Sequence, residues 1–307
     1  MRNKKIIFSI GSYQYLKEEI LGLGDFEHGK TEVKIFPDGE RYQRILTSVS
    51  GREVVLIGGT ISDSDTLEMY DLAFALTKYG ASSIYLIFPY FGYSTMERAR
   101  MPGEVVTAKS RAVIFSSLPR TSQGNFLMFF DLHSDGIPHY FEGPSLIKHI
   151  HCKNLVTRLA EELGEPGFVM ACTDAGRAKW VEWLANEMGV DAAFVFKRRI
   201  SGEQTEITSI SADVKEKDVV IYDDMIRTGG SLVNAARAYK EAGAKNIFAI
   251  TTHGLFNNDA ISKIKKSGVI CQLVTTNSHP NSVKYTHAFL RVESIAPLIV
   301  KELGKYH

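Results

Sequence analysis

The chain has 307 residues, of which 44% are hydrophobic and 23% are charged, and its formal net charge is +1. This is the composition of a globular protein with room for two ordinary domains. The balanced charge gives no overall attraction to nucleic acid or to a membrane surface. The three cysteines, Cys152, Cys172 and Cys271, form no CxxC pair, which argues against a disulfide framework or a structural zinc site.

No segment has the features of a targeting signal or a membrane span. The apolar run after Lys5 is only about five residues long, shorter than the apolar core of a signal peptide. No apolar stretch approaches the ~20 residues that cross a bilayer. We therefore expect a cytoplasmic protein with neither a membrane nor a nucleic acid among its partners.

Short β-branched runs alternate with segments of helical spacing along most of the chain. Apolar runs that predict strands lie at residues 4–11, 32–36, 52–59, 82–90, 126–132, 166–172, 191–196, 217–224, 245–254 and 268–276. Helical spacing is found at residues 65–80, 144–164, 178–189, 231–243 and 292–303. Continuous apolar strands separated by helices predict an α/β fold whose parallel sheets are covered by helices on both faces.

An internal repeat divides the chain. Residues 52–93 align with residues 217–256, and both copies read strand, loop, helix, turn, strand. Two copies of one α/β unit explain the length better than one large sheet. We therefore predict two tandem domains, residues 1–145 and 146–307, with a last helix that is able to pack on either half.

The second copy carries an unusual strand end. Four apolar residues lead into Asp223 and Asp224, and the loop Thr228-Gly229-Gly230-Ser231 then precedes an Ala-rich helix. Glycines and a helix N-terminus allow backbone N–H groups to converge on a phosphate. Carboxylates repel phosphate but accept hydrogen bonds from sugar hydroxyls. The stretch therefore predicts a sugar-phosphate site, and a plain strand-end turn with an Asp cap is the alternative.

The first copy lacks this loop. Its sequence, GGTISDSDT, has no double acid at the strand end and places Asp65 where the second copy has Gly230. A carboxylate at that position repels an anion, so we expect the phosphate site in the second copy only.

Several motifs together resemble one family over nearly the whole chain. Residues 219–232 resemble the phosphoribosyl-diphosphate-binding motif of the type I phosphoribosyltransferase fold. Other motifs resemble the ribose-phosphate diphosphokinase branch of that fold: FPDGE at 36–40, PYFGY at 89–93, PGEVVTAK at 102–109, DLHSD at 131–135, TDAG at 173–176 and KRR at 197–199. The resemblance implies two tandem phosphoribosyltransferase-type, Rossmann-like domains, the first on the nucleotide and assembly side and the second holding ribose 5-phosphate.

The resemblance also implies a reaction and its substrates. Members of the family transfer the diphosphoryl group of ATP to the anomeric hydroxyl of ribose 5-phosphate with Mg²⁺, giving AMP and phosphoribosyl diphosphate for nucleotide biosynthesis. Asp223 and Asp224 are then expected to contact the ribose hydroxyls. The 5-phosphate is expected to bind to Arg227, Thr228, Gly229, Gly230 and Ser231.

The basic run at residues 197–199 fits this reaction. Diphosphoryl transfer depends on positioning and on neutralising the charge of phosphate oxygens, although a solvated strand end is the ordinary alternative for such a run. The resemblance implies that Lys197 is the catalytic lysine and that Arg199 contacts substrate. The polar residues 201–211 are expected to form an irregular loop that closes over the substrate.

Two strand ends carry candidate metal ligands. His133 and Asp174 each follow an apolar run, and together with water and phosphate oxygens they can hold Mg²⁺. Residue chemistry alone favours a hydrogen-bonded histidine, because imidazole is an unusual ligand for Mg²⁺, whereas the resemblance implies a metal ligand. His139, His149 and His151 lack this context and are expected on the surface or in packing.

The FPDGE motif reads by itself as a strand end and a tight turn. In the family that it resembles, the motif reaches the ATP of a neighbouring subunit. This implies a nucleotide-binding role for Phe36, Asp38, Gly39 and Glu40. It also implies a homo-oligomer built from dimers, with the hexamer as the family's usual form, whose sites are shared between subunits.

Two motifs depart from the family pattern. Residues 94–97 read Ser-Thr-Met-Glu where the family has Ala-Arg-Gln-Asp, so Thr95 and Met96 replace a cation and an amide that contact the nucleotide. We therefore expect weak ATP binding or another nucleoside triphosphate donor. Near the sugar site, Arg177 and Trp180 replace a small residue and an arginine, which alters the floor of that site or supplies a replacement cation.

Three functions are open from the sequence. The leading hypothesis is an active ribose-phosphate diphosphokinase, because the phosphate loop, the basic run and the candidate metal ligands occur together. The second is a non-catalytic regulatory paralogue that binds sugar phosphate and assembles with an active synthetase, supported by Thr95 and Met96. The third is a phosphoribosyltransferase acting on a base, for which the sequence offers no base-recognition segment, and fold alone does not separate the three.

Overall fold

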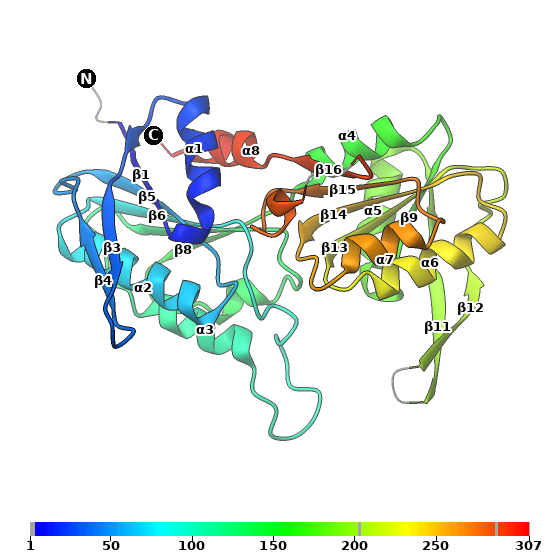
Figure 1. Ribbon diagram of the computed structural model, residues 1–307, viewed down its shortest axis with the longest axis horizontal. Coiled ribbons are helices and arrows are strands. Elements are labelled where there is room, and N and C mark those ends of the chain that lie inside the picture. The colour runs from blue at the N-terminus through cyan, green and yellow to red at the C-terminus, as the bar shows by residue number, and fades with distance from the viewer. Residues whose placement is uncertain (1–3, 202–203, 286–287, 307) are drawn as a thin grey trace. The chain divides into compact units, whose positions relative to one another are not determined.

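The chain forms two compact α/β units, and each is built around its own sheet (Figure 1). The computed structural model describes residues 4–201, 204–285 and 288–306. One unit comprises Met1–His151 with Ile295–His307, and the other comprises Cys152–Ser294. Across this described part of the chain, no helix has both the length and the apolar character needed to cross a membrane.

The sheet of the first unit has six parallel strands in the order β2-β1-β5-β6-β7-β8. Their bounds are Ile6–Ser9 (β1), Glu27–His28 (β2), Glu53–Ile57 (β5), Ser83–Phe88 (β6), Asn125–Phe130 (β7) and Leu146–Ile150 (β8). Figure 1 places α1 (Gln14–Leu23) and α8 (Ala296–Leu303) on one face and α2 (Asp63–Lys78) and α3 (Thr107–Ser116) on the other. Because both faces are covered, the central strands are continuous apolar runs.

The sheet of the second unit also has six parallel strands, in the order β10-β9-β13-β14-β15-β16. Their bounds are Val169–Cys172 (β9), Asp191–Ala193 (β10), Val219–Ile226 (β13), Ile247–Gly254 (β14), Gln272–Thr276 (β15) and Leu290–Glu293 (β16). The helices of this unit are α4 (Lys153–Leu163), α5 (Ala178–Met188), α6 (Gly230–Glu241) and α7 (Ala260–Lys266). The predicted α/β fold with parallel sheets and flanking helices is therefore confirmed.

Two antiparallel hairpins belong to neither sheet. In the first unit, β3 (Thr31–Ile35) pairs with β4 (Arg41–Ile45). In the second unit, β11 (Val195–Ser201) pairs with β12 (Gln204–Ile210), where we predicted an irregular loop. The alternation of polar and β-branched residues after Gln204 suits a two-stranded ribbon, which explains the difference.

The predicted helix at residues 144–164 is wrong over its first part. Leu146–Ile150 forms β8 and pairs with β7, and only Lys153–Leu163 is helical. A short apolar run of this kind fits either element, and its pairing with β7 decides the outcome. The first unit extends through β8, beyond the border that we predicted between residues 145 and 146, and it includes α8.

The PYFGY segment leaves no space for a side chain at Gly92. The N–H of Gly92 donates to Thr60 Oγ1 at 2.7 Å, and a Cβ at Gly92 would lie 2.0 Å from the carbonyl oxygen of Thr60. We expect Gly92→Ala to lower the free energy of unfolding by about 1–3 kcal/mol, because the backbone must move to relieve this contact. Urea unfolding of the full chain measures the loss.

Gly22→Ala is the matched control. Gly22 lies in α1, and a Cβ there would meet nothing within 4 Å. The free energy of unfolding of this variant should equal that of the parent or exceed it by up to about 1 kcal/mol, because alanine favours a helix over glycine. If Gly92→Ala were as stable as the control, the packing argument would be wrong.

Candidate functional site

The double acid lies inside β13 and not at its end. β13 pairs with β14 as far as Ile226, beyond the end at Asp224 that we predicted. Residues 219–222 are buried, so the two acids emerge at the carboxyl edge of the sheet, where open α/β sheets bind ligands. Asp223 is half-buried, and the side chain of Asp224 is only 2% exposed.

Arg177 binds Asp224 through two contacts. Its Nε donates to Asp224 Oδ1 at 3.1 Å, and its Nη2 lies 2.5 Å from Oδ2. The arginine side chain is 17% exposed, so the pair is largely removed from water. This bidentate geometry is the strongest that arginine makes with a carboxylate. Asp224 is one of the two acids predicted to bind sugar hydroxyls. Arg177, which stands where the family pattern has a small residue, therefore already binds one of these acids.

Asp223 has a different environment from Asp224. The hydroxyl of Thr173, at the end of β9, donates to Asp223 Oδ2 at 2.8 Å. Burial, followed by the charge of Asp224, raises the pKa of Asp223 to about 8. Asp223 is thus largely protonated at neutral pH, and Asp224 faces the guanidinium of Arg177. A neutral Asp223 lowers the repulsion between the acid pair and an anionic sugar.

The loop after β13 leads directly into α6. Gly229 precedes the helix with φ +74°, and a Cβ there would lie 2.6 Å from Ile264 Cγ1, so both conformation and space require glycine. Within the described residues, no side-chain hydrogen bond caps the start of α6, and its first turn contains no acid. Backbone N–H groups at this terminus are therefore suited to an anion.

Lys263 adds a cation that sequence reasoning missed. It lies on α7, and its Nζ is 3.5 Å from the position that a Cβ of Gly230 would take. An ammonium group there raises the positive potential at the start of α6. The lysine is separated from the loop by more than thirty residues of sequence, so no local pattern connects the two.

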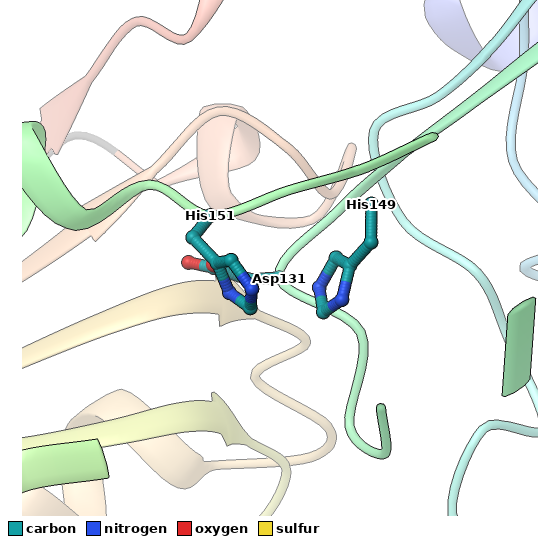
Figure 2. A group of neighbouring side chains, drawn as sticks. All are labelled: Asp131, His149 and His151. Carbon is teal, nitrogen blue, oxygen red and sulfur yellow. The ribbon is translucent and has the colours of Figure 1, made fainter. Parts of the chain in front are cut away.

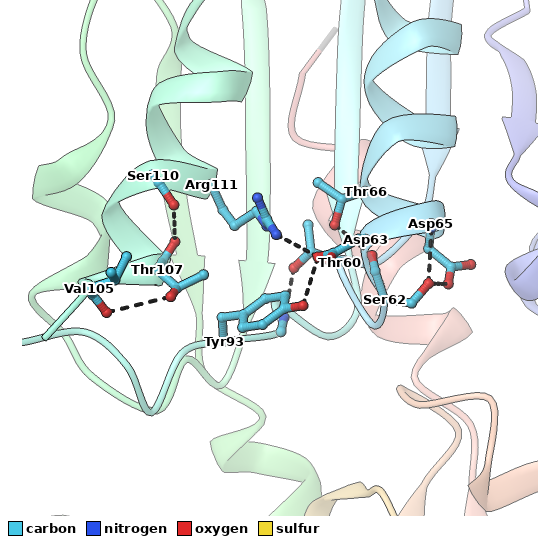
Figure 3. A network of polar contacts seen from close by, with 11 residues as sticks. Thr60, Ser62, Asp63, Asp65, Thr66, Tyr93, Val105, Thr107, Ser110 and Arg111 are labelled. Carbon is cyan, nitrogen blue, oxygen red and sulfur yellow. Dashed lines mark hydrogen bonds and ion pairs between the residues drawn. The ribbon is translucent and has the colours of Figure 1, made fainter.

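The corresponding loop of the first unit is filled by its own side chains (Figure 3). Ser62 Oγ accepts the N–H of Asp65 at 3.0 Å and caps α2. Asp63 accepts from the hydroxyl of Tyr93 at 2.7 Å and from Arg111 Nη2 at 2.5 Å. The hydrogen bond from Tyr93, with help from Arg111, lowers the pKa of Asp63. Carboxylates thus occupy this helix N-terminus, which favours the second unit as the anion site.

The segment that departs from the family's nucleotide contacts forms a turn after PYFGY. The side chain of Met96 is 46% exposed, and that of Thr95 is half-buried. Arg98 is 70% exposed, and its Nε lies 3.3 Å from Glu97 Oε1. The nearby cation Arg111 is held by Asp63 and lies over the ring of Tyr93, with its Cζ 4.9 Å from the ring centroid.

The remaining predicted residues are spread over both units. His133 follows β7 in the first unit, and Asp174 follows β9 in the second. Asp174 is exposed, and its Oδ1 accepts the N–H of Gly176 at 2.9 Å. Lys197 and Arg199 lie two positions apart on β11, and their side chains lie outside the described part of the structure.

The FPDGE motif forms the tip of the β3–β4 hairpin. The N–H of Phe36 donates to the carbonyl of Glu40 at 2.8 Å, and Glu40 N–H donates to Asp38 Oδ1 at 3.1 Å. Gly39 has φ +91°, a left-handed conformation that favours glycine. The tight turn predicted from the sequence is confirmed, and the side chains of the tip are exposed.

Three side chains gather where β7 and β8 end. Asp131, His149 and His151 place their ligand atoms within 4.8 Å of one another. We predicted that the two histidines lie on the surface or in packing, and the sequence gives no local sign of the cluster. The signal is the pairing of β7 with β8, which a sequence alone does not supply.

Loss of Arg177 should destabilise the second unit. Arg177→Ala leaves Asp224 buried without its cation, and we expect the free energy of unfolding to fall by about 3–5 kcal/mol. Adding Asp224→Asn should recover part of the loss, because the unpaired charge is removed. Chemical denaturation of the full chain measures each variant.

Arg158→Ala provides the comparison for that experiment. Arg158 pairs with Glu162 and Glu293, but its side chain is 47% exposed. Exposed ion pairs contribute little, so this change should cost less than about 1 kcal/mol. If Arg158→Ala and Arg177→Ala lowered the free energy of unfolding equally, burial of the Arg177–Asp224 pair would not add to its contribution to stability.

Asp223 should make stability depend on pH. Its pKa rises from 3.8 to about 8 on folding, so between these values the folded state holds a proton that the unfolded state releases. Its contribution to stability should therefore fall as the pH rises from about 4 to about 8. In Asp223→Asn, this pH-dependent part of the stability should be absent. The free energy of unfolding is measured with urea between about pH 4 and about pH 8, in buffer that contains EDTA to exclude bound metal. A similar effect of Asn at the exposed Asp213 would refute the assignment.

Comparison with known proteins identifies the family. The model for the N-terminal domain of ribose phosphate pyrophosphokinase matches residues 5–118, and that for the phosphoribosyl synthetase-associated domain matches residues 181–305. The curated ribose-phosphate pyrophosphokinase of Fusobacterium nucleatum is 32% identical over 280 residues, covering 90% of this chain and 86% of the relative. The ribose-phosphate pyrophosphokinase of Helicobacter pylori strain 26695 is 32% identical over 312 residues, which cover 100% of this chain and 94% of the relative.

A solved structure extends the match to the fold. The crystal structure of phosphoribosylpyrophosphate synthetase from Mycobacterium smegmatis superposes with a TM-score of 0.86 and covers 99% of this chain and 98% of its own, at 24% identity. This match confirms the predicted tandem phosphoribosyltransferase-type fold. The two family models and the 32% identity to relatives of nearly equal length show that the chain belongs to the ribose-phosphate pyrophosphokinase family.

Proposed function

We propose that this chain is an active ribose-phosphate diphosphokinase. It transfers the diphosphoryl group of ATP to the anomeric hydroxyl of ribose 5-phosphate, giving AMP and phosphoribosyl diphosphate for nucleotide biosynthesis. The observation that carries the proposal is the loop after β13, where an acid-free helix N-terminus follows two carboxylates. A phosphorylated sugar satisfies both features, because its phosphate suits the helix and its hydroxyls suit the carboxylates.

In this proposal, the acceptor sugar binds to the second unit. Asp223 and Asp224 receive ribose hydroxyls, and Arg227, Thr228, Gly229, Gly230 and Ser231 hold the 5-phosphate. Arg177 contacts both oxygens of Asp224, so Asp223 has more capacity left for a hydroxyl. Lys263 contributes charge beside the phosphate, and this addition is supported by its position next to Gly230.

Lys197 and Arg199 supply the charge for the transfer step. We assign Lys197 as the catalytic lysine and Arg199 as a substrate contact. Both residues belong to strand β11 of the β11–β12 hairpin, two positions apart. A compact ammonium and a planar guanidinium suit the oxygens of a moving diphosphoryl group, because the reaction depends mainly on neutralising its charge.

Mg²⁺ is the metal that we propose for the reaction, held by His133 and Asp174. The exposed carboxylate of Asp174 fits this role, since the N–H of Gly176 orients it and leaves lone pairs for a hydrated ion. The imidazole of His133 is a less usual ligand. When bound, the ion neutralises charge on the polyphosphate of the donor.

The β3–β4 hairpin supports an oligomer with shared sites. Phe36 is 45% exposed at its tip, and Val33, Ile35 and Leu46 expose apolar side chains along it or beside it. Contiguous exposed apolar groups are typical of protein contacts. We propose a homo-oligomer built from dimers, up to the hexamer, in which Phe36, Asp38, Gly39 and Glu40 reach the nucleotide of a neighbouring subunit.

We place the reaction in the cytoplasm. All three cysteines are present as thiols, and Cys271 is exposed, as is usual for proteins of a reducing compartment. The partners that we propose for this chain are its two substrates, ribose 5-phosphate and the nucleoside triphosphate.

A donor panel tests the proposal directly. The full chain is incubated with ribose 5-phosphate, Mg²⁺ and each nucleoside triphosphate, and the monophosphate and phosphoribosyl diphosphate are quantified. We expect turnover, with weak use of ATP or preference for another donor, because Thr95 and Met96 replace the usual nucleotide contacts. Lys197→Ala should lower kcat by about 10²–10³. Lys245→Ala, an exposed lysine paired with Glu165 in the same unit, should retain full activity.

Two results would overturn parts of this proposal. Full activity of Lys197→Ala would remove that lysine from catalysis, and tight, exclusive use of ATP would contradict the inference from Thr95 and Met96. No turnover with any donor, combined with ribose 5-phosphate binding and assembly with an active synthetase, would identify a regulatory paralogue.

A further inference from the structure

We propose that Asp131, His149 and His151 form a binding site for one divalent ion of the Zn²⁺, Co²⁺ or Ni²⁺ class. The site lies in the first unit and contains neither His133 nor Asp174, the residues to which we assign Mg²⁺. It uses two imidazoles and one carboxylate at the carboxyl ends of two neighbouring strands (Figure 2).

Parallel strand pairing brings the three residues together. Phe129 of β7 pairs with His149 of β8, and the N–H of Asp131 donates to the carbonyl of Ile150 at 3.0 Å, so the ladder continues beyond the strand end. Asp131 therefore stands beside His151. Residues two apart on a strand share a face, which puts the carboxylate and both imidazoles on one face of the sheet.

The distances suit a shared ion. His151 Nδ1 lies 3.8 Å from Asp131 Oδ1, and the two imidazole centroids are 4.1 Å apart with planes tilted by 48°. Two nitrogen ligands of one tetrahedral Zn²⁺ lie roughly 3.3 Å apart, given bonds of ~2.0–2.1 Å. The ligand atoms lie within 4.8 Å of one another, so side-chain rotation brings them to this spacing.

Surrounding groups hold two of the three ligands in the structure without an ion. Asp131 is 4% exposed and has φ +37°, a conformation rare outside glycine and typical of functional positions. His149 Nδ1 lies 3.3 Å from the carboxylate of Asp135, an arrangement that directs the lone pair to Nε2. That lone pair now accepts the N–H of Leu132 at 2.9 Å. Ion binding therefore includes a rotation of the ring that exchanges this amide for the metal.

The donor set selects the class of metal. Imidazole nitrogens suit Zn²⁺, Co²⁺ and Ni²⁺, whereas Mg²⁺ prefers oxygen ligands and retains its water. Three protein ligands leave a fourth position open, and the 41% exposure of the His151 side chain puts that position toward solvent. The site is thus distinct in chemistry from the one assigned to Mg²⁺.

A bound ion would connect the ends of β7 and β8. Asp131 begins the loop that carries His133, so the ion would fix the start of that loop. The proposal stands on the first unit alone and does not need the chain to be an active diphosphokinase.

Titration of the metal-free full chain with Zn²⁺ by calorimetry, and with Co²⁺ by visible absorption, tests the site; any polyhistidine tag is removed first. We expect about one equivalent of ion per chain and the absorption of Co²⁺ with nitrogen ligands. His149→Ala and His151→Ala should each weaken binding by more than about tenfold. His151 is partly exposed, so its variant should keep the fold, which circular dichroism checks.

Two variants separate this site from other histidines. His139→Ala removes an exposed histidine of the same unit and should bind Zn²⁺ like the parent. His133→Ala should also keep Zn²⁺ binding while losing Mg²⁺-dependent turnover, so failure of the proposed reaction and failure of this site give different results. The proposal is overturned if the parent binds no ion, or if binding survives both His149→Ala and His151→Ala.

Discussion

Parallel strand pairing is the constraint on which the sites of this protein depend. In the six-stranded sheet of each unit, all strands run in one direction, so every carboxyl end lies on the same edge of the sheet. Chain segments that are distant in sequence meet at that edge. Thr173 after β9 contacts Asp223 of β13 in this way, and Asp131 after β7 stands beside His151 after β8. The buried strands supply the rigidity, and the residues that follow them supply the chemistry.

The repeated α/β unit separates into two roles through its helix N-termini. Every such terminus leaves backbone N–H groups that need partners. In the first unit, Ser62 accepts the N–H of Asp65, and the carboxylates of Asp63 and Asp65 lie in the first turn of the helix. Tyr93 and Arg111 bind the carboxylate of Asp63. In the second unit, Gly229 opens the helix and no acid follows. Identical topology thus gives a helix N-terminus that its own side chains occupy in one unit, and the terminus that we propose for an anion in the other.

The sequence predicted those parts of the fold and site that depend on neighbouring residues. The loop before the helix at residues 230–241 and the turn in FPDGE were predicted correctly. In both, the glycines that allow the turn lie within a few residues of the ends of the elements that the turn connects. The contact of Arg177 with Asp224 and the approach of Lys263 to Gly230 escaped prediction, because each joins separate elements. The strand β8 was mistaken for a helix for the same reason, since only pairing with β7 distinguishes the two.

Arg177 changes what the acid pair can do for a ligand. Two ionised carboxylates beside a phosphate loop would repel a sugar phosphate while accepting its hydroxyls. Here the guanidinium neutralises Asp224, and burial together with that neighbour keeps Asp223 protonated near neutral pH. The pair and its arginine then carry almost no net charge, yet Asp223 can still both accept and donate a hydrogen bond. In the proposed sugar site, Arg177 would therefore weaken hydroxyl binding to Asp224 and lower the repulsion of the phosphate, which adapts the site and does not simply block it.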